Sequence, residues 1–179
     1  MARLSTGKKM NKAYIMVLTS NSYLSGILVV HHCLKLTGTE IPIYVCVTDT
    51  LSSETLETLN KAGINTIKIN ILECGNIEMD PEYYSAHWPA TFSKLEIFKL
   101  VQFDKIVYID ADMLICDNLD HLFDKPHFSA VNAGGFKFKN WVNLNSGLLV
   151  IEPSWDEYNK IVTVLNDKTN KHGNDQDVL

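Results

Sequence analysis

Residues 105–116, KIVYIDADMLIC, are the most informative part of this 179-residue chain. They begin with a short apolar run, residues 106–109, that has the length and composition of a buried strand. Two carboxylates, Asp110 and Asp112, then interrupt the apolar sequence, and residues 113–115 continue it. Because an unpaired charge is expensive to bury, we expect the aspartates to lie at the edge of a sheet, between apolar residues that belong to the core.

The segments before this strand predict an alternation of strands and helices. Three apolar runs of strand length cover residues 14–18, 43–47 and 64–69. Helical periodicity fills the two connections between them, and polar residues that can cap a helix stand near Asn21 and Ser52. This order is typical of an α/β protein, in which helices cover both faces of a mostly parallel sheet.

The connection after the third run is long and irregular. Residues 73–91 contain Pro, Gly and clustered aromatics, and such loops tend to be functional in compact domains. A helix is predicted next, over residues 93–101, because Ser93 and Glu96 have the spacing of a capping box. The other predicted elements are a short helix at 117–123, strands at 128–131 and 144–151, and a helix that starts at Ser154 with Trp155 on its apolar face.

Length, composition and charge limit the class of protein. The chain is long enough for one domain with a substantial core, and its 46% hydrophobic and 21% charged residues are typical of globular proteins. Its net charge of -5 disfavours a nucleic acid as partner, since proteins that bind a phosphate backbone usually carry a basic face. No apolar run reaches the ~20 residues of a transmembrane segment.

The cysteines and the first residues indicate the compartment and the domain organisation. None of the four cysteines has C-x-x-C spacing, so we expect reduced thiols in a cytoplasmic protein. Residues 1–12 are polar and basic, lack the apolar core of a signal peptide and are interpreted as a flexible leader. Residues 13–179 are then expected to form a single domain, and the possibility of a homodimer stays open.

Asp110 and Asp112 are candidates for a metal site. Residues two apart on a strand point to the same face, so both carboxylates would project together if the strand geometry continues. Ligands of open α/β sheets bind beyond the carboxyl ends of the strands. Two carboxylates at that edge suit Mg²⁺ or Mn²⁺, and such an ion can hold a diphosphate and neutralise a departing phosphate. Two solvated aspartates at a strand end are the alternative.

Three further groups have both a functional and a structural interpretation. Lys94 would lie in the first turn of a helix capped by Ser93, where a cation opposes the helix dipole by ~0.5 kcal/mol and a bound anion would remove the conflict. A solvated lysine is the alternative. Asn145 and Ser146 would either bond to a sugar or phosphate at the sheet edge or form a turn. Residues 175–177, Asp-Gln-Asp, would either contribute to a functional site or simply begin a helix.

Six motifs occur in a characteristic order: LTSN (18–21), TFSKLEIFKL (91–100), YIDADML (108–114), NLDHLF (118–123), NSGLLVI (145–151) and NDQDVL (174–179). With them the chain resembles, from about residue 14 to its end, the retaining glycosyltransferases of family eight, the group of glycogenin, galactinol synthase and bacterial lipopolysaccharide galactosyltransferases. The resemblance implies a Rossmann-like GT-A nucleotide-diphospho-sugar transferase fold, an α/β fold whose mixed, mostly parallel central sheet is flanked by helices. It also implies metal-dependent transfer of a hexose from a UDP-sugar to the hydroxyl of a carbohydrate or other acceptor.

The resemblance implies roles for individual residues. Asp110 and Asp112 would bind Mn²⁺ (or Mg²⁺), which bridges to the donor diphosphate, and Ala111 between them would also lie at the donor. Lys94 matches the helix lysine near the donor. The other residues implied to bind the donor are Leu18, Ser20, Asn21, Tyr23 (in a Tyr-x-x-Gly pattern with Gly26), Asn145 and Ser146. The residues implied to lie beside the anomeric carbon are Asp175 and Gln176.

The chain also departs from the family pattern. Ala133 and His172 stand where glycogenin has acidic residues. Family members continue well past the Asp-Gln-Asp segment, and their third metal ligand, a histidine, lies in that continuation. We therefore expect a catalytic domain truncated at its C-terminus, with weakened binding of metal and diphosphate.

Two other functions remain as alternatives. A truncated or degenerate nucleotide-sugar-binding module would bind UDP without transferring the sugar. A phosphatase of the haloacid dehalogenase type also carries D-x-D after an apolar strand. That class places the motif on its first strand, however, and has Thr or Val where this chain has Leu114. The sequence leaves the transferred sugar, the acceptor and the choice between a protein nucleophile and a front-face reaction open.

Overall fold

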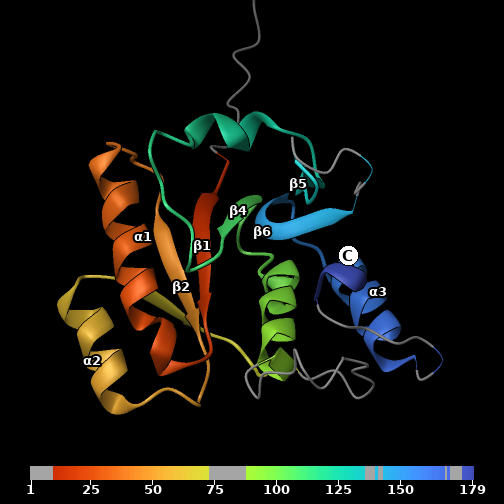
Figure 1. The fold of residues 1–179 in the computed structure, drawn as a ribbon, viewed down its shortest axis with the longest axis horizontal. Helices are drawn as coiled ribbons and strands as arrows, with labels where there is room; N and C mark the ends of the chain where they lie inside the picture. The colour runs from red at the N-terminus through yellow and green to blue at the C-terminus, as the bar shows by residue number, and fades with distance from the viewer. Residues whose placement is uncertain (1–9, 73–87, 136–139, 141–142, 168, 170–174) are drawn as a thin grey trace, which may run out of the picture.

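The computed structural model describes residues 10–72, 88–135, 140, 143–167, 169 and 175–179 of the chain. Its centre is a six-stranded sheet with the order β3-β2-β1-β4-β6-β5 (Figure 1). Within the part β3-β2-β1-β4 of the sheet, neighbouring strands run parallel, whereas β6 runs antiparallel to both β4 and β5. The strands are β1 (Lys12–Leu18), β2 (Ile43–Val47), β3 (Asn65–Lys68), β4 (Lys105–Ile109), β5 (Ser129–Asn132) and β6 (Leu144–Ile151). The predicted mixed, mostly parallel α/β sheet is therefore confirmed.

Helices cover both faces of the sheet. On one face lie α1 (Leu24–Leu36), α2 (Ser53–Lys61) and the 3-10 helix η3 (Asp120–Asp124), and on the other lie the 3-10 helix η2 (Trp88–Lys99) and α3 (Trp155–Asn166). Two further short 3-10 helices are η1 (Asn21–Tyr23) and η4 (Asp175–Asp177). No helix among the described residues is long and apolar enough to cross a membrane.

The alternation of side chains along β1 explains why its sequence is apolar without interruption. Tyr14, Met16 and Leu18 pack with Ile27 of α1 on one face. Ile15 points to the other face and packs in the core that η2 and α3 cover. A strand that is buried on both faces needs an apolar side chain at every position, which is the pattern that the sequence shows.

Two of the predicted helix starts are confirmed by their capping bonds. Ser52 accepts a hydrogen bond from the Thr55 amide at 3.2 Å, and Ser154 accepts one from the Glu157 amide at 3.1 Å. The predicted cap of the first helix is wrong. Ser20 caps the short η1, and α1 begins after Tyr23 without a side-chain cap.

The capping box predicted at Ser93 and Glu96 is also wrong. The helix η2 already begins at Trp88, so both residues lie within it. The Ser93 hydroxyl accepts from the Leu72 amide at 3.0 Å, and the Glu96 carboxylate accepts from the Asn70 amide at 3.1 Å. Residues three apart share one face of a helix, and here that face holds the segment after β3. Of the predicted functional loop at 73–91, residues 73–87 lie outside the described residues.

Smaller differences concern single residues. β1 starts at Lys12, inside the predicted leader. Trp155 is 55% exposed, and Ile161 and Leu165 are the buried residues of α3. After β4 only part of the predicted return to the core occurs, because Ile115 is buried but Leu114 is 71% exposed.

Candidate functional site

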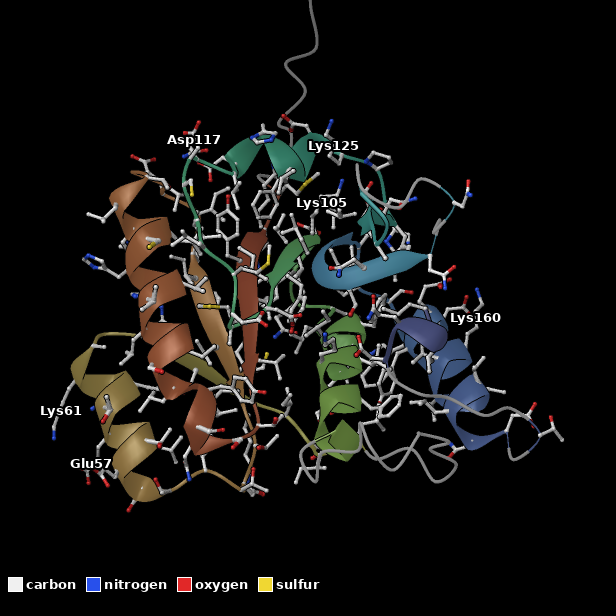
Figure 2. The ribbon with its side chains drawn as sticks, viewed as in Figure 1. Glu57, Lys61, Lys105, Asp117, Lys125 and Lys160 are labelled. Atoms are coloured by element: carbon white, nitrogen blue, oxygen red, sulfur yellow. The ribbon has the colours of Figure 1, made fainter. Side chains whose placement is uncertain are left out.

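The candidate site lies at the carboxyl end of β4. Asp110 follows the last residue of this strand, and its amide donates to the carbonyl of Gly147 at 2.8 Å. Because β6 runs antiparallel to β4, its first residues, including Asn145 and Ser146, extend past the end of β4. Lys105, which starts β4, lies near Lys125 at the opposite end of the strand (Figure 2). Lys105, which is paired with Glu152, and Asp110 thus lie at opposite ends of β4.

The ammonium group of Lys94 is the centre of the site. Its Nζ lies 3.2 Å from Asp110 Oδ1 and 3.4 Å from Asp110 Oδ2. The same Nζ lies 3.2 Å from Ser146 Oγ and 3.2 Å from Asp175 Oδ2. These partners come from the end of β4, from β6 and from η4. Four residues predicted from sequence are therefore brought together around one cation.

The environment of Lys94 differs from the predicted one. The residue lies in the middle of η2 and not in its first turn, so the expected conflict with the helix dipole does not arise. Lys94 is only 8% exposed, which excludes the alternative of a solvated lysine. A buried ammonium requires compensation by opposite charge, and the carboxylates of Asp110 and Asp175 supply it.

Tyr108 is part of this cluster although the sequence did not single it out. Its hydroxyl donates to Asp110 Oδ1, and Lys94 Nζ lies 5.5 Å from the centre of its ring. Burial, together with the negative charge of Asp110, raises the pKa of Tyr108 far above its usual range, so the phenol stays a proton donor at neutral pH. The signal in the sequence is its position two residues before Asp110, since such residues share one side of a strand.

Two glycines allow backbone and side chains to approach closely. A Cβ atom on Gly26 of α1 would lie 2.2 Å from the carbonyl oxygen of Ala111, so α1 can contact the turn after β4 only with glycine there. A Cβ atom on Gly147 would lie 3.0 Å from Asn145 Oδ1 and 3.2 Å from Asp110 Oδ2. Gly147 therefore leaves the space beside Asp110 Oδ2 without a side chain.

Asp175 carries an incompletely satisfied carboxylate. The residue is 5% exposed, and its Oδ2 is a buried side-chain oxygen without a hydrogen bond among the described residues. Lys94 Nζ is within ion-pair distance of this oxygen but does not complete a hydrogen bond to it. A buried acceptor without a donor costs about 1–3 kcal/mol, so its presence is expected where a polar ligand completes the arrangement. The neighbouring Gln176 is half-buried in the same η4.

Asp112 does not join this cluster. The prediction that Asp110 and Asp112 share one face required the strand to continue, but β4 ends at Ile109. A turn follows, in which the Met113 amide donates to the Asp110 carbonyl at 3.3 Å, so the alternation of a strand no longer applies. Asp112 is exposed in this turn.

The residues predicted to hold the uridine lie at the end of the neighbouring strand β1. Leu18 is buried, Ser20 caps η1 and Tyr23 is 50% exposed. The Asn21 side chain accepts a hydrogen bond from the Ser52 amide at 3.0 Å, which joins η1 to the start of α2. Since β1 pairs directly with β4, these residues lie on the same edge of the sheet as Asp110.

The residues at this edge fit a hard divalent cation in part. Asp110 Oδ2 faces Gly147, which adds no side chain beside it, and Asp112 offers a second carboxylate that is exposed in the turn. Carboxylate oxygens are the ligands that Mg²⁺ and Mn²⁺ prefer. Within the described part of the chain, no group of three or more His, Cys, Asp or Glu residues is arranged to hold a metal. Among the described residues, Asp110 and Asp112 are therefore the carboxylates available to a cation at this edge.

Comparison with solved structures identifies the fold. The galactosyltransferase LgtC, solved with donor and acceptor sugar analogs, superposes with a TM-score of 0.68 at 19% identity over 93% of this chain and 68% of that one. The glycosyltransferase GlyE of Streptococcus pneumoniae TIGR4 superposes with a TM-score of 0.64 at 19% identity over 94% of this chain and 42% of that one. These similarities confirm the predicted GT-A fold.

Comparison of sequences identifies the family. Human glycogenin-1 is 28% identical over 170 residues, which are 94% of this chain and 47% of glycogenin-1. UDP-glucuronate:xylan alpha-glucuronosyltransferase 1 of Arabidopsis thaliana is 31% identical over 180 residues, which are 99% of this chain and 25% of that protein. The chain therefore spans half or less of the length of these relatives. Residues 14–179 match the family model described as glycosyl transferase family 8, and the chain belongs to this family.

Proposed function

We propose that the protein is a metal-dependent retaining glycosyltransferase that moves a hexose from a UDP-sugar to an acceptor hydroxyl. The observation that carries this proposal is the convergence of Asp110, Ser146 and Asp175 on the buried ammonium of Lys94. The partly buried carboxylate of Asp110 and the exposed carboxylate of Asp112 follow β4 at the carboxyl edge of the sheet, which suits the cation of a donor diphosphate. Membership of glycosyl transferase family 8 supports the same reaction class.

In this proposal Asp110 and Asp112 hold Mn²⁺ or Mg²⁺. When bound, the ion neutralises the charge that develops on the departing UDP. Lys94 adds a second positive charge beside the donor. The uridine lies along the end of β1, against Leu18, Ser20, Asn21 and Tyr23, and the backbone at Ala111 borders the diphosphate.

Asp175, Gln176, Asn145 and Ser146 are proposed to surround the transferred sugar. A double displacement would require a nucleophile on the far side of the anomeric carbon, and Asp175 is the carboxylate that could act there. Its ion pair with the Lys94 ammonium lowers its nucleophilicity. We therefore favour a front-face reaction, in which the leaving phosphate accepts the proton of the acceptor hydroxyl.

We propose an acceptor and a compartment for a chain whose 179 residues match only part of each relative. The acceptor is a carbohydrate or another hydroxyl compound, and the reaction takes place in the cytoplasm, where the free thiols of Cys33, Cys46 and Cys116 would persist. The second candidate is a nucleotide-sugar-binding module without transfer activity. It is favoured by the small number of metal-ligating side chains among the described residues.

Calorimetric titration with Mn²⁺ and UDP tests the metal assignment. We expect wild-type protein to bind UDP more tightly with Mn²⁺ than without it, and the double variant Asp110→Asn, Asp112→Asn to lose this difference. The matched control is Asp117→Asn, Asp124→Asn, which removes the same charge from exposed aspartates of the segment that follows. Equal Mn²⁺ binding by the Asp110, Asp112 variant and by wild type would falsify the assignment.

Incubation with UDP-glucose and UDP-galactose distinguishes the two candidate functions. Mn²⁺-dependent release of UDP, by transfer or by slow hydrolysis, is expected of a transferase. Binding of UDP without any turnover of either donor supports the binding module.

A further inference from the structure

Tyr108 is held rigidly by the sheet. Its strand, β4, pairs with β1 on one side and with β6 on the other, and Tyr108 itself is paired with Ile15 and with Leu149. The side chain is 2% exposed. A buried side chain on a central strand has little freedom to move, so the position of its hydroxyl is set by the core and not by the site.

Asp110, in contrast, lies just outside the strand. Its backbone is anchored by the bond from its amide to Gly147, but its carboxylate is 29% exposed and belongs to a turn. The hydroxyl of Tyr108 reaches Oδ1 of this carboxylate. An immobile donor thus holds a side chain that could otherwise rotate.

The two oxygens of Asp110 have different surroundings. Oδ1 accepts from the Tyr108 hydroxyl and lies 3.2 Å from Lys94 Nζ. For Oδ2 the nearest described donor is Lys94 Nζ, at the longer distance of 3.4 Å. A Cβ atom on Gly147 would lie 3.2 Å from Oδ2, so glycine keeps this side of the carboxylate free of a methyl group. Oδ2 is therefore the oxygen that can accept a further ligand.

We infer that Tyr108 is a positioning residue, which holds Asp110 Oδ1 so that Asp110 Oδ2 faces the bound cation. The inference rests on the proposed function, because it requires a metal at Asp110. Lys94 Nζ contacts both oxygens, so the Tyr108 hydroxyl is the donor that distinguishes them. Without this hydroxyl, the carboxylate can rotate about its Cα–Cβ bond, and Oδ2 is no longer fixed toward the cation. Loss of such a supporting hydrogen bond typically weakens metal binding by about 10-fold or more.

A purely structural role of Tyr108 makes a different prediction, and Tyr14 provides the matched control. Tyr14 is fully buried on the neighbouring strand β1, and its hydroxyl donates to Asp120 Oδ1 at 2.8 Å. Asp120 belongs to η3 and lies outside the proposed site. Tyr108→Phe and Tyr14→Phe therefore remove the same kind of hydrogen bond, but only the first removes it from a proposed metal ligand.

The test is titration of Mn²⁺ into wild-type protein, Tyr108→Phe and Tyr14→Phe in the presence of UDP. Free Mn²⁺ is followed by electron paramagnetic resonance, and UDP binding is measured separately with the metal chelated. We expect Tyr108→Phe to weaken Mn²⁺ binding by about 10-fold or more, with metal-free UDP binding unchanged. Tyr14→Phe should leave both unchanged. Equal Mn²⁺ affinity for Tyr108→Phe and wild type, or equal losses for both variants, would overturn the inference.

Two further variants keep the inference testable if Tyr108→Phe folds poorly. Gly147→Ala places a Cβ atom 3.2 Å from Asp110 Oδ2 while Tyr108 stays intact, so it should weaken Mn²⁺ binding, and unchanged binding would contradict the assignment of Oδ2. In an Asp110→Asn background, Tyr108→Phe should cause no additional loss of Mn²⁺ affinity, and an additional loss contradicts action through Asp110. If wild-type protein itself binds no Mn²⁺, the metal assignment fails and the inference fails with it.

Discussion

Replacing Lys94 with methionine should destabilise the fold, because it removes the cation that two carboxylates share. Methionine keeps most of the length and apolar surface of the lysine side chain, so the change mainly removes charge. The side chains of Lys94 and Asp175 are only 10% and 8% exposed, so solvent screens their ion pair weakly. Asp110 keeps the hydroxyl of Tyr108, whereas Asp175 Oδ2 loses the ion pair with Lys94 that compensates its charge.

The expected magnitude follows from this difference. Breaking a buried ion pair by removing one partner costs about 3–5 kcal/mol. We expect about 3 kcal/mol, the lower end, because Asp110 is 29% exposed and retains a donor. For a chain of this length, that loss lowers the melting temperature by roughly 6–12 °C. Adding Asp175→Asn to Lys94→Met should restore part of the stability, because the uncompensated buried charge is then gone.

Urea and thermal unfolding, followed by circular dichroism, measure these differences. The control is Lys61→Met, which removes an ion pair with Glu57 at 3.6 Å whose side chains are 77% and 68% exposed. It should cost no more than about 0.5 kcal/mol. The reasoning is refuted if Lys94→Met unfolds at the same urea concentration as Lys61→Met, or if adding Asp175→Asn lowers the stability further.

Two other predictions concern α1. Gly26→Ala gains about 1 kcal/mol of helix propensity but places its Cβ atom 2.2 Å from the Ala111 carbonyl, an overlap of a kind that costs about 1–3 kcal/mol. We expect this variant to lose affinity for UDP in calorimetry, and an unchanged affinity would show that α1 does not position the turn. Burial, followed by the charges of Lys35 and His32, lowers the pKa of His31 in the folded protein, so the neutral form is favoured. The unfolded state then binds more protons, and this contribution to stability is fully present above about pH 6.5 and is lost as the pH falls below it. His31→Gln should flatten the dependence of melting temperature on pH between 7 and 5, and an equally steep dependence contradicts the assignment.

Much of the architecture was predictable because its causes are local. The uninterrupted apolar run of β1 follows from burial on both faces, and the caps at Ser52 and Ser154 depend on residues three positions away. Family membership was predictable for a similar reason, since six short motifs in one order are visible without knowledge of contacts. Mixed topology was implied by the family resemblance, and the structure confirms it through the antiparallel pairing of β6 with β4.

The site itself depends on contacts between residues far apart in the chain. The spacing of Ser93 and Glu96 fits both a helix cap and a helix face, and only packing against the segment after β3 selects the second. Asp110 and Asp112 would have shared a face had β4 continued, but the turn at Asp110 separates them.

Sequence by itself thus determined most of the elements, the family and the candidate residues. The reason is that strand burial, helix capping and motifs depend on residues close together in the chain. Tertiary structure determined which candidates meet. Lys94 and Asp175 are brought together because η2 and η4 pack at the same end of β4 and β6, and Tyr108 becomes part of the site because its strand ends beneath Asp110. These contacts depend on the packing of elements that are distant in the sequence. A charge that becomes buried by this packing is stable only if an opposite charge is buried beside it.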